Sequence, residues 1–150
     1  MKHIYISGKI GEKVISEATK GKFLKIQRKL ESEGWHVFNP TCQDWQTFLR
    51  QWMDGRKTYL KNHHISEYAL TLLLDIGKLS ECDAIYMLPD FIDSPGAKAE
   101  HAFALAVGMQ VYYDDELYRD GTLRGKHYQK NRFPWSEKMI QPELKKERDG

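Results

Sequence analysis

Four short runs of β-branched and aromatic residues most constrain what this 150-residue chain can fold into. They are HIYISG (3–8), HVFNP (36–40), DAIYMLP (83–89) and QVYYD (110–114). Runs of this length and composition predict buried strands, and three of them stop at a glycine or a proline. Segments long enough for helices separate the runs. This order predicts right-handed βαβ crossovers and a mainly parallel sheet.

The segments between the predicted strands carry apolar residues at helical spacing. We expect helices over residues 14–34, ending at Gly34, over residues 65–82, and within residues 93–108. Helices that connect parallel strands cover both faces of the sheet. The predicted fold is therefore α/β, with three layers and a flavodoxin-like or Rossmann-like arrangement.

Two segments lie outside this alternation. Residues 41–62 are expected to form an irregular helical insertion in an α/β domain that spans residues 1–115, because Trp45, Phe48 and Trp52 fall at helical spacing. Residues 116–150 are expected to form a polar C-terminal extension whose last residues fray. Aromatic residues that can anchor this extension on the body or on a neighbouring subunit are Tyr118, Tyr128, Phe133 and Trp135.

Composition excludes several classes of function. Hydrophobic residues make up 41% and charged residues 29%, which is typical of soluble globular proteins. The net charge of +2 is too small to indicate a nucleic-acid polymer or a membrane surface as partner. No apolar run reaches the roughly 18 residues that span a bilayer, and the N-terminus lacks a signal-peptide pattern, so we expect a cytoplasmic protein. Cys42 and Cys82 lack the spacing of a disulfide framework or a zinc site.

In an open parallel sheet, ligands bind beyond the carboxyl ends of the strands. The segments SGKIGEK (7–13) and PDFIDSPGAKAE (89–100) are expected at that edge. GKIG is similar to a phosphate-cradling turn and makes Gly8, Lys9 and Ile10 candidate ligand contacts, but it lacks the spacing of a P-loop or a dinucleotide fingerprint. A plain glycine turn between strand and helix is the alternative interpretation.

The segment DSPGAKAE is more informative. Ser94 can cap a helix whose first residue is Pro95, and this leaves backbone N–H groups facing a ligand. Glu100 follows about one and a half turns later, at the start of an almost wholly apolar helix. Its carboxylate is either a solvated group on the exposed stripe of that helix or a functional group on the floor of a pocket.

Four further polar residues are candidates for a functional or a capping role. Asp75 interrupts the apolar segment LTLLLDIGKL, where an aspartate has poor helix propensity, so it is either functional or part of an exposed face. Asp83 is interpreted as a capping residue at the entry to a strand. His63 and His64 point in different directions on a helix and have no third partner, so no metal is expected.

Three motifs together resemble the nucleoside 2-deoxyribosyltransferase superfamily, in particular its short deoxyribosyltransferase-like members from bacteria and phages. The motifs are IYISGKI (4–10), DIGKLSECDAIYMLP (75–89) and SPGAKAEHAFALAVG (94–108). The third motif, with a glutamate six residues after the serine, is the specific one. Residues 41–62 and the C-terminal extension are not matched in detail.

The resemblance implies a role for three residues. Glu100 would be the nucleophile that attacks C1′ of the sugar, Asp75 would assist the departing base, and Tyr5 would hold the nucleophile through its hydroxyl. General chemistry agrees, because an oxocarbenium-like transition state is stabilised and then trapped by a carboxylate. A partly buried carboxyl group with a raised pKa suits proton delivery to the base.

The resemblance also bears on a 5′-phosphate. Relatives that act on nucleoside 5′-monophosphates have a serine at the position of Ser94, and Gly96 and Lys98 belong to the same motif. These relatives usually carry an arginine in the turn after the first strand, where this chain has Gly11 between Lys9 and Lys13. Lys98 is a second possible partner for a phosphate.

Two functions from different classes remain open on the sequence alone. The first is an enzyme that cleaves or transfers the N-glycosidic bond of a nucleoside or nucleoside 5′-monophosphate, as a hydrolase or a transferase. The second is a protein that binds and sequesters a nucleotide or nucleotide signal in the same pocket without cleaving it. Neither requires a cofactor. The resemblance further implies a homodimer or a higher homo-oligomer.

Overall fold

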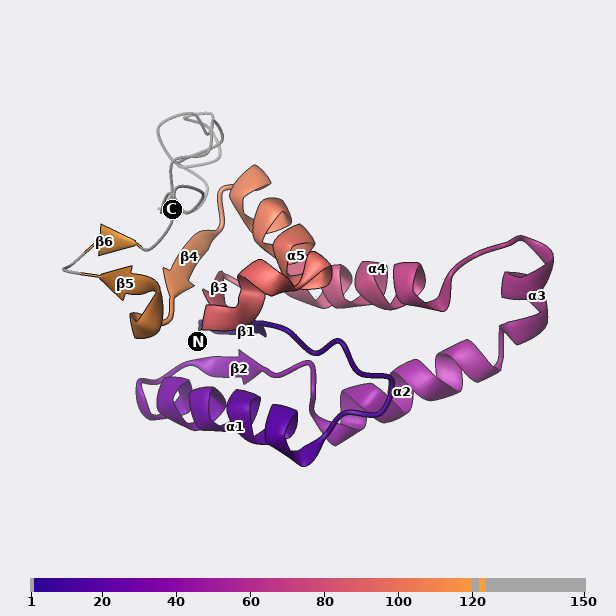
Figure 1. Ribbon diagram of the computed structural model, residues 1–150, viewed down its shortest axis with the longest axis horizontal. Helices are drawn as coiled ribbons and strands as arrows, with labels where there is room; N and C mark the ends of the chain where they lie inside the picture. The colour runs from indigo at the N-terminus through magenta and orange to yellow at the C-terminus, as the bar shows by residue number, and fades with distance from the viewer. Residues whose placement is uncertain (1, 120–121, 124–150) are drawn as a thin grey trace.

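Within residues 2–119, the fold centres on a four-stranded, all-parallel sheet (Figure 1). The computed structural model describes residues 2–119 and 122–123. The strands are β1 (His3–Ser7), β2 (His36–Phe38), β3 (Ala84–Met87) and β4 (Gln110–Tyr113), in the order β2-β1-β3-β4. This is the flavodoxin-like order, and it confirms the α/β fold class that the sequence predicts.

Strand β1 is an inner strand of the sheet, and later strands of the chain are added on both sides of it. Tyr5 pairs with Phe38 of β2 on one side and with Ile85 of β3 on the other. The chain adds β2 on the first side of β1, and then β3 and β4 on the second side. Because the direction of growth reverses between β1 and β3, a crevice is expected at their carboxyl ends, where sheets of this kind bind ligands.

Helices cover both faces of the sheet and complete the three layers. Helix α1 (Glu17–Ser32) packs on the face that carries Ile4, whereas α4 (Glu67–Ser80) and α5 (Pro95–Ala106) pack on the face that carries Tyr5. Side chains alternate between the faces along each strand, so β1 contributes to both cores. Burial on both faces explains why β1 and β3 have continuous apolar sequences.

Each of the three helices that cover the sheet begins at a serine cap. The side chains of Ser16, Ser66 and Ser94 each accept a hydrogen bond from the backbone N–H three residues later. Pro95 occupies the first position of α5, as the sequence predicts. Gly34 follows the end of α1 with a φ of +95°, a conformation that favours glycine and that stops the helix where predicted.

Residues 41–62 form a helical insertion, as predicted, but its helices are regular where an irregular segment was expected. They are α2 (Gln43–Asp54) and α3 (Lys57–Asn62), with a break at Gly55. Trp45, Leu49 and Met53 are the buried residues of α2, and their spacing of four explains the regular helix. Helices α2 and α3 lead away from the sheet before the chain returns along α4 (Figure 1).

Short elements complete the described chain. They are the 3₁₀ helices η1 (Pro89–Asp93) and η2 (Asp115–Leu117) and a separate antiparallel pair, β5 (Tyr118–Arg119) and β6 (Thr122–Leu123). The rest of the predicted C-terminal extension, with Tyr128, Phe133 and Trp135, lies outside the described residues. Across residues 2–119, none of the helices combines the length and the apolarity that crossing a membrane requires.

Gly8, directly after β1, is required for packing. A Cβ atom at this position would lie 2.5 Å from Cδ1 and 2.8 Å from Cβ of Leu88, which is 1% exposed. The backbone after β1 therefore approaches the end of β3 closely. Gly11, three residues later, has a φ of +56° and is the position in this loop where the backbone conformation favours glycine.

We expect Gly8→Ala to lower the free energy of unfolding by about 1–3 kcal/mol, because the added methyl group overpacks a well-filled site. The measurement is urea denaturation. Gly21→Ala is the matched control, since a Cβ at Gly21 in α1 meets nothing within 4 Å. This control should be neutral or stabilise the protein by up to about 1 kcal/mol. Equal effects of the two variants would contradict the close approach.

Candidate functional site

The site is built around the carboxylate of Glu100, which lies on α5 and is only 6% exposed. The hydroxyl of Tyr5 donates a hydrogen bond to Oε2 of Glu100, and Oγ of Ser7 donates one to Oε1 at 2.7 Å. Both oxygens of the carboxylate are therefore held by buried hydroxyl groups. The interpretation of Glu100 as a solvated residue on an exposed stripe was wrong.

The two hydroxyl groups come from one face of one strand. Tyr5 and Ser7 are two residues apart on β1, so their side chains point to the same face of the sheet. This is the face on which α5 packs. The carboxyl end of β1 and the first half of α5 therefore meet at Glu100.

The second carboxyl group comes from α4. Asp75 is partly buried, and its Oδ1 accepts a hydrogen bond of 2.8 Å from the indole Nε1–H of Trp45. Trp45 lies on α2 and is 7% exposed. The charge of Asp75 acts on both Tyr5 and Glu100, which indicates that the two carboxyl groups belong to one site.

Burial sets the protonation of this site. It raises the pKa of Glu100 to about 7, while the hydrogen bonds from Tyr5 and Ser7 oppose the rise and the charge of Asp75 adds to it. Burial also raises the pKa of Asp75 to about 6, against the hydrogen bond from Trp45. The pKa of Tyr5 is raised well above its ordinary value, first by burial and then by the charge of Glu100, so its phenol remains a hydrogen-bond donor.

Between about pH 6 and pH 7, the pair of carboxyl groups therefore holds about one proton. One member can then act as an ionised nucleophile or base while the other acts as an acid. Two neighbouring carboxyl groups with raised pKa values are typical of catalytic sites, although structural networks also produce them. The chemistry open to this arrangement is acid–base or covalent catalysis at a single carbon centre.

The loop after β1 is tied to η1. The backbone N–H of Lys9 donates to Asp90 Oδ1 at 3.0 Å, and Lys22 Nζ contacts both Asp90 Oδ2, at 2.5 Å, and the carbonyl oxygen of Lys9, at 2.8 Å. The Lys9 N–H is thus engaged within the protein instead of facing a ligand. The Lys9 side chain is exposed, and Ile10 packs against the core on the α1 side.

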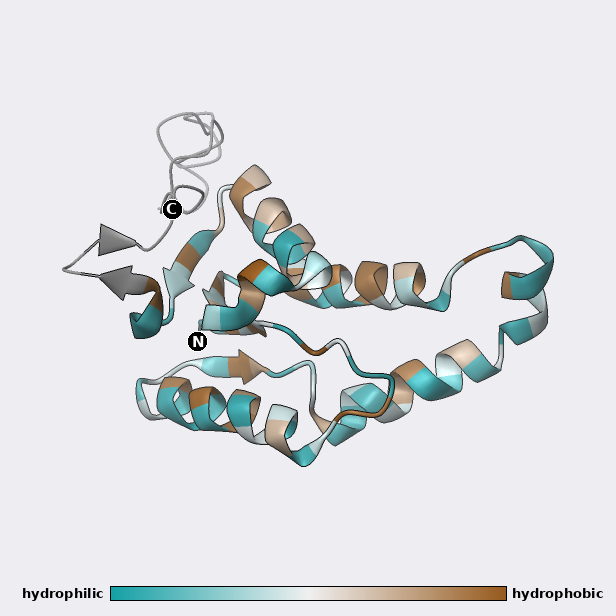
Figure 2. Cartoon of the chain, viewed as in Figure 1, coloured by the Kyte–Doolittle hydropathy of each residue, from teal (hydrophilic) through white to brown (hydrophobic). Residues whose placement is uncertain are grey.

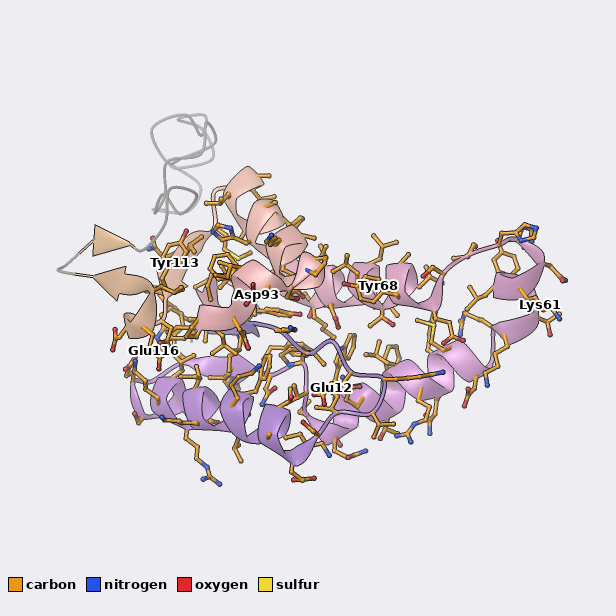
Figure 3. All side chains as sticks on the ribbon, in the orientation of Figure 1. Glu12, Lys61, Tyr68, Asp93, Tyr113 and Glu116 are labelled. Atoms are coloured by element: carbon orange, nitrogen blue, oxygen red, sulfur yellow. The ribbon has the colours of Figure 1, made fainter. Side chains whose placement is uncertain are left out.

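The start of α5 lies six residues before Glu100. Ser94 is 8% exposed, and its Oγ accepts from the backbone N–H of Ala97 at 3.1 Å. The hydroxyl of Tyr68, on the first turn of α4, approaches Gly96 so closely that a Cβ there would lie 2.9 Å from it. Lys98 is exposed on the same turn. Figure 3 shows Tyr68 on α4, in the part of the helix that precedes Asp75.

Sequence reasoning missed two residues that hold the carboxyl groups. Ser7 could have been found, because it shares a strand face with Tyr5. Trp45 could not, because only the packing of α2 against α4 brings it to Asp75. Asp83 directly precedes β3, and its Oδ2 accepts a hydrogen bond of 2.8 Å from the backbone N–H of His3 at the start of β1, the neighbouring strand.

The two adjacent histidines lie outside the site. His63 and His64 follow α3, at the end of the segment where Figure 3 labels Lys61. Within the part of the chain that the structure describes, no group of three or more histidine, cysteine, aspartate or glutamate residues has the geometry to hold a metal ion.

A protein-family profile described as "Domain of unknown function (DUF4406)" matches residues 2–113. The chain belongs to the DUF4406 family. The matched range covers the whole parallel sheet, its covering helices and both carboxyl groups of the site. Searches of curated proteins and of solved structures found no significant match.

The raised pKa of Glu100 predicts how stability depends on pH. Because the folded protein binds this proton more tightly than the unfolded chain, the stabilisation is present at low pH and is lost as pH rises through about 7. From pH 5.5 to pH 8, Glu100 should lower the free energy of unfolding by about 2 kcal/mol. Urea denaturation at the two pH values measures the change.

Glu100→Gln should remove most of that pH dependence, because an amide does not titrate. Glu17→Gln is the control, since the Glu17 side chain is 93% exposed at the start of α1, and it should behave as the parent protein does. A parent-like pH dependence in Glu100→Gln would show that burial does not raise the pKa of Glu100.

Proposed function

We propose that this protein cleaves or transfers the N-glycosidic bond of a nucleoside or a nucleoside 5′-monophosphate, with Glu100 as the nucleophile. One observation carries the proposal: Glu100 is buried at the carboxyl edge of the sheet, and both of its oxygens are held by the hydroxyl groups of Tyr5 and Ser7. Burying a carboxylate is costly unless it is hydrogen-bonded, and the arrangement aims this group at the edge where such sheets bind ligands.

In the first step, an oxygen of the ionised Glu100 carboxylate attacks C1′ while the bond between C1′ and the base nitrogen breaks. The bonding electron pair leaves with the base, which takes a proton from Asp75. A new ester bond between C1′ and Glu100 then holds the sugar. The two carboxyl groups share about one proton near neutral pH, and the higher pKa of Glu100 places it mainly there. The reactive form, with Glu100 ionised and the proton on Asp75, is therefore a minor form of the free protein.

In the second step, water or the nitrogen of another base attacks C1′. The electron pair of the ester bond returns to Glu100, and the Asp75 carboxylate takes a proton from the attacking group. Tyr5 and Ser7 stabilise the carboxylate that is released. Hydrolysis and transfer thus use the same protein side chains. They differ only in whether water or a second base accepts the sugar.

A 5′-phosphate on the substrate would lie at the start of α5. Six residues of helix separate Ser94 from Glu100, a rise of about 9 Å, which is the size range of a pentose with its 5′-phosphate. Helix N-termini favour anions through their backbone N–H groups. Ser94 and Gly96 at that terminus, and the exposed Lys98 next to it, are the proposed phosphate contacts.

We further propose a homodimer or higher homo-oligomer that forms through α4 and α5. These two helices pack side by side, and Figure 2 shows apolar residues along both. Leu73 is 63% exposed, Tyr68 is 60% exposed and Val107 is 47% exposed. Exposed apolar side chains on neighbouring helices are typical of a protein–protein interface.

The activity is tested by incubating the protein with ribo- and deoxyribonucleosides and their 5′-monophosphates and measuring free base by chromatography. Glu100→Gln should lower the rate by about 10³-fold or more, because it removes the nucleophile. Glu17→Gln, at an exposed position on α1, should release base at the parent rate. Mass spectrometry of the denatured protein after brief mixing should detect the sugar on the parent protein and not on Glu100→Gln.

Absence of free base with every substrate would reject the enzymatic proposal. If a nucleotide nevertheless raises the melting temperature of the parent protein, the same pocket serves a binding function, and Glu100 then contacts a ribose hydroxyl. Base release that persists in Glu100→Gln would reject the role of Glu100 as the nucleophile.

The oligomer is tested by sedimentation velocity over a range of protein concentrations. Leu73→Lys should shift the parent oligomer toward monomer, because it places a charge in the apolar interface. Leu24→Lys on α1 is the control, since Leu24 is also exposed, at 38%, but lies on the opposite face of the sheet. A parent protein that is monomeric at all concentrations would contradict the proposal.

A further inference from the structure

We propose that Trp45 is a positioning residue of this site: its indole N–H fixes the carboxyl group of Asp75 in the orientation that proton transfer to the departing base requires. The inference rests on the proposed function for the role of Asp75, but the contact itself does not. It makes α2, a helix outside the sheet layers, a part of the site.

The geometry is that of a rigid donor. Trp45 Nε1 lies 2.8 Å from Asp75 Oδ1, across 30 residues of sequence. The indole is 7% exposed, and it is held between the ring of Phe48, stacked at 5.2 Å and 19°, and the ring of Phe38, edge-on at 5.4 Å. An indole packed on two sides cannot turn its N–H away from Asp75 without disturbing its neighbours.

The same aromatic row also reaches the nucleophile. Phe38 on β2 stacks against Tyr5 at 5.4 Å and 17°, and Tyr5 donates its hydroxyl to Glu100. One phenyl ring therefore contacts both of the aromatic residues that orient the carboxyl groups. This shared contact fixes the two carboxyl groups relative to each other. A nucleophile and an acid that act on the same substrate bond need such a fixed alignment.

The hydrogen bond also decides which oxygen of Asp75 faces the ligand. It engages Oδ1, so Oδ2 is the oxygen available to hold or deliver a proton. Three ionisable groups lie around the hydrogen-bonded Trp45 and Asp75: Glu100 on α5, Tyr5 on β1 and Lys78 on α4. The Nζ atom of Lys78 lies 5.5 Å from the centre of the Trp45 ring. The indole N–H favours the ionised form of Asp75, and burial opposes it.

A purely structural role for Trp45 is the competing explanation, since a buried indole stabilises any core. Two observables separate the roles. The first needs no activity and no variant at Trp45: the ¹H–¹⁵N resonance of the Trp45 indole in the parent protein should shift with pH, with a midpoint near the Asp75 pKa of about 6. Asp75→Asn should abolish this shift. The indole of Trp52, which packs under Arg56 at 4.0 Å, should not show it.

The second observable is the pH dependence of base release by Trp45→Phe, which keeps a ring and loses the N–H. We expect kcat to fall roughly 10-fold with little change in KM, because a misaligned acid slows the chemical step and leaves binding intact. The acid limb of the pH profile should move to higher pH, because Asp75 has the lower pKa of the two carboxyl groups and loses a donor that favours its ionised form. Trp52→Phe, the same change two turns along α2, should match the parent protein.

Four outcomes decide the inference. A Trp45 indole resonance that does not titrate in the parent protein would overturn it, as would equal kcat values and pH profiles for Trp45→Phe and Trp52→Phe. A titrating resonance that Asp75→Asn abolishes supports it even if Trp45→Phe does not fold. If the parent protein releases no base while the resonance titrates with Asp75, the proposed function fails and the positioning of Asp75 by Trp45 stands.

Discussion

The burial of one carboxylate governs the organisation of this protein. Glu100 sits 6% exposed beneath the carboxyl edge of the sheet, where water cannot solvate it and protein groups must. Tyr5 and Ser7 meet this demand because the alternation along β1 points both hydroxyl groups toward α5. The order of the strands also matters. Because β1 lies next to β3 and the direction of sheet growth reverses between them, the two hydroxyl groups lie at the carboxyl edge, where sheets of this kind generally bind ligands.

Two opposing effects bring the site to a protonation state that suits chemistry near neutral pH. Desolvation favours the neutral acids, whereas the hydroxyl donors and the indole favour the anions. Desolvation is the larger effect at both positions, but the donors limit it, so the pKa values remain near neutrality. A carboxyl group buried without these donors would remain protonated and could not act as a nucleophile. The same balance predicts that the folded protein becomes less stable as pH rises.

The periphery of the site is fixed by contacts between loops that are distant in sequence. Lys22 on α1 bridges Asp90 in η1 and the carbonyl oxygen of Lys9, so the loops after β1 and β3 are held together through the helix on the opposite face. Gly8 permits the close approach of these two loops, because any side chain there would meet Leu88. On the other side, α2 supplies Trp45. The site is thus assembled from both helical layers and from a helix outside them.

The sequence by itself determined the alternation of strands and helices, the capped start of α5 and the candidacy of Asp75 and Glu100, whereas Tyr5 became a candidate only through the family resemblance. These features are local, since strand composition, a Ser–Pro helix start and an acid in an apolar helix are visible within a few residues. Only the tertiary structure decided that Glu100 is buried, that Ser7 and Trp45 hold the carboxyl groups, and that residues 41–62 form regular helices, the first of which supplies Trp45 to the site. The physical reason is that burial and hydrogen bonding between α2 and α4, or between β1 and α5, depend on packing across 30 to 95 residues of sequence, which no local pattern encodes.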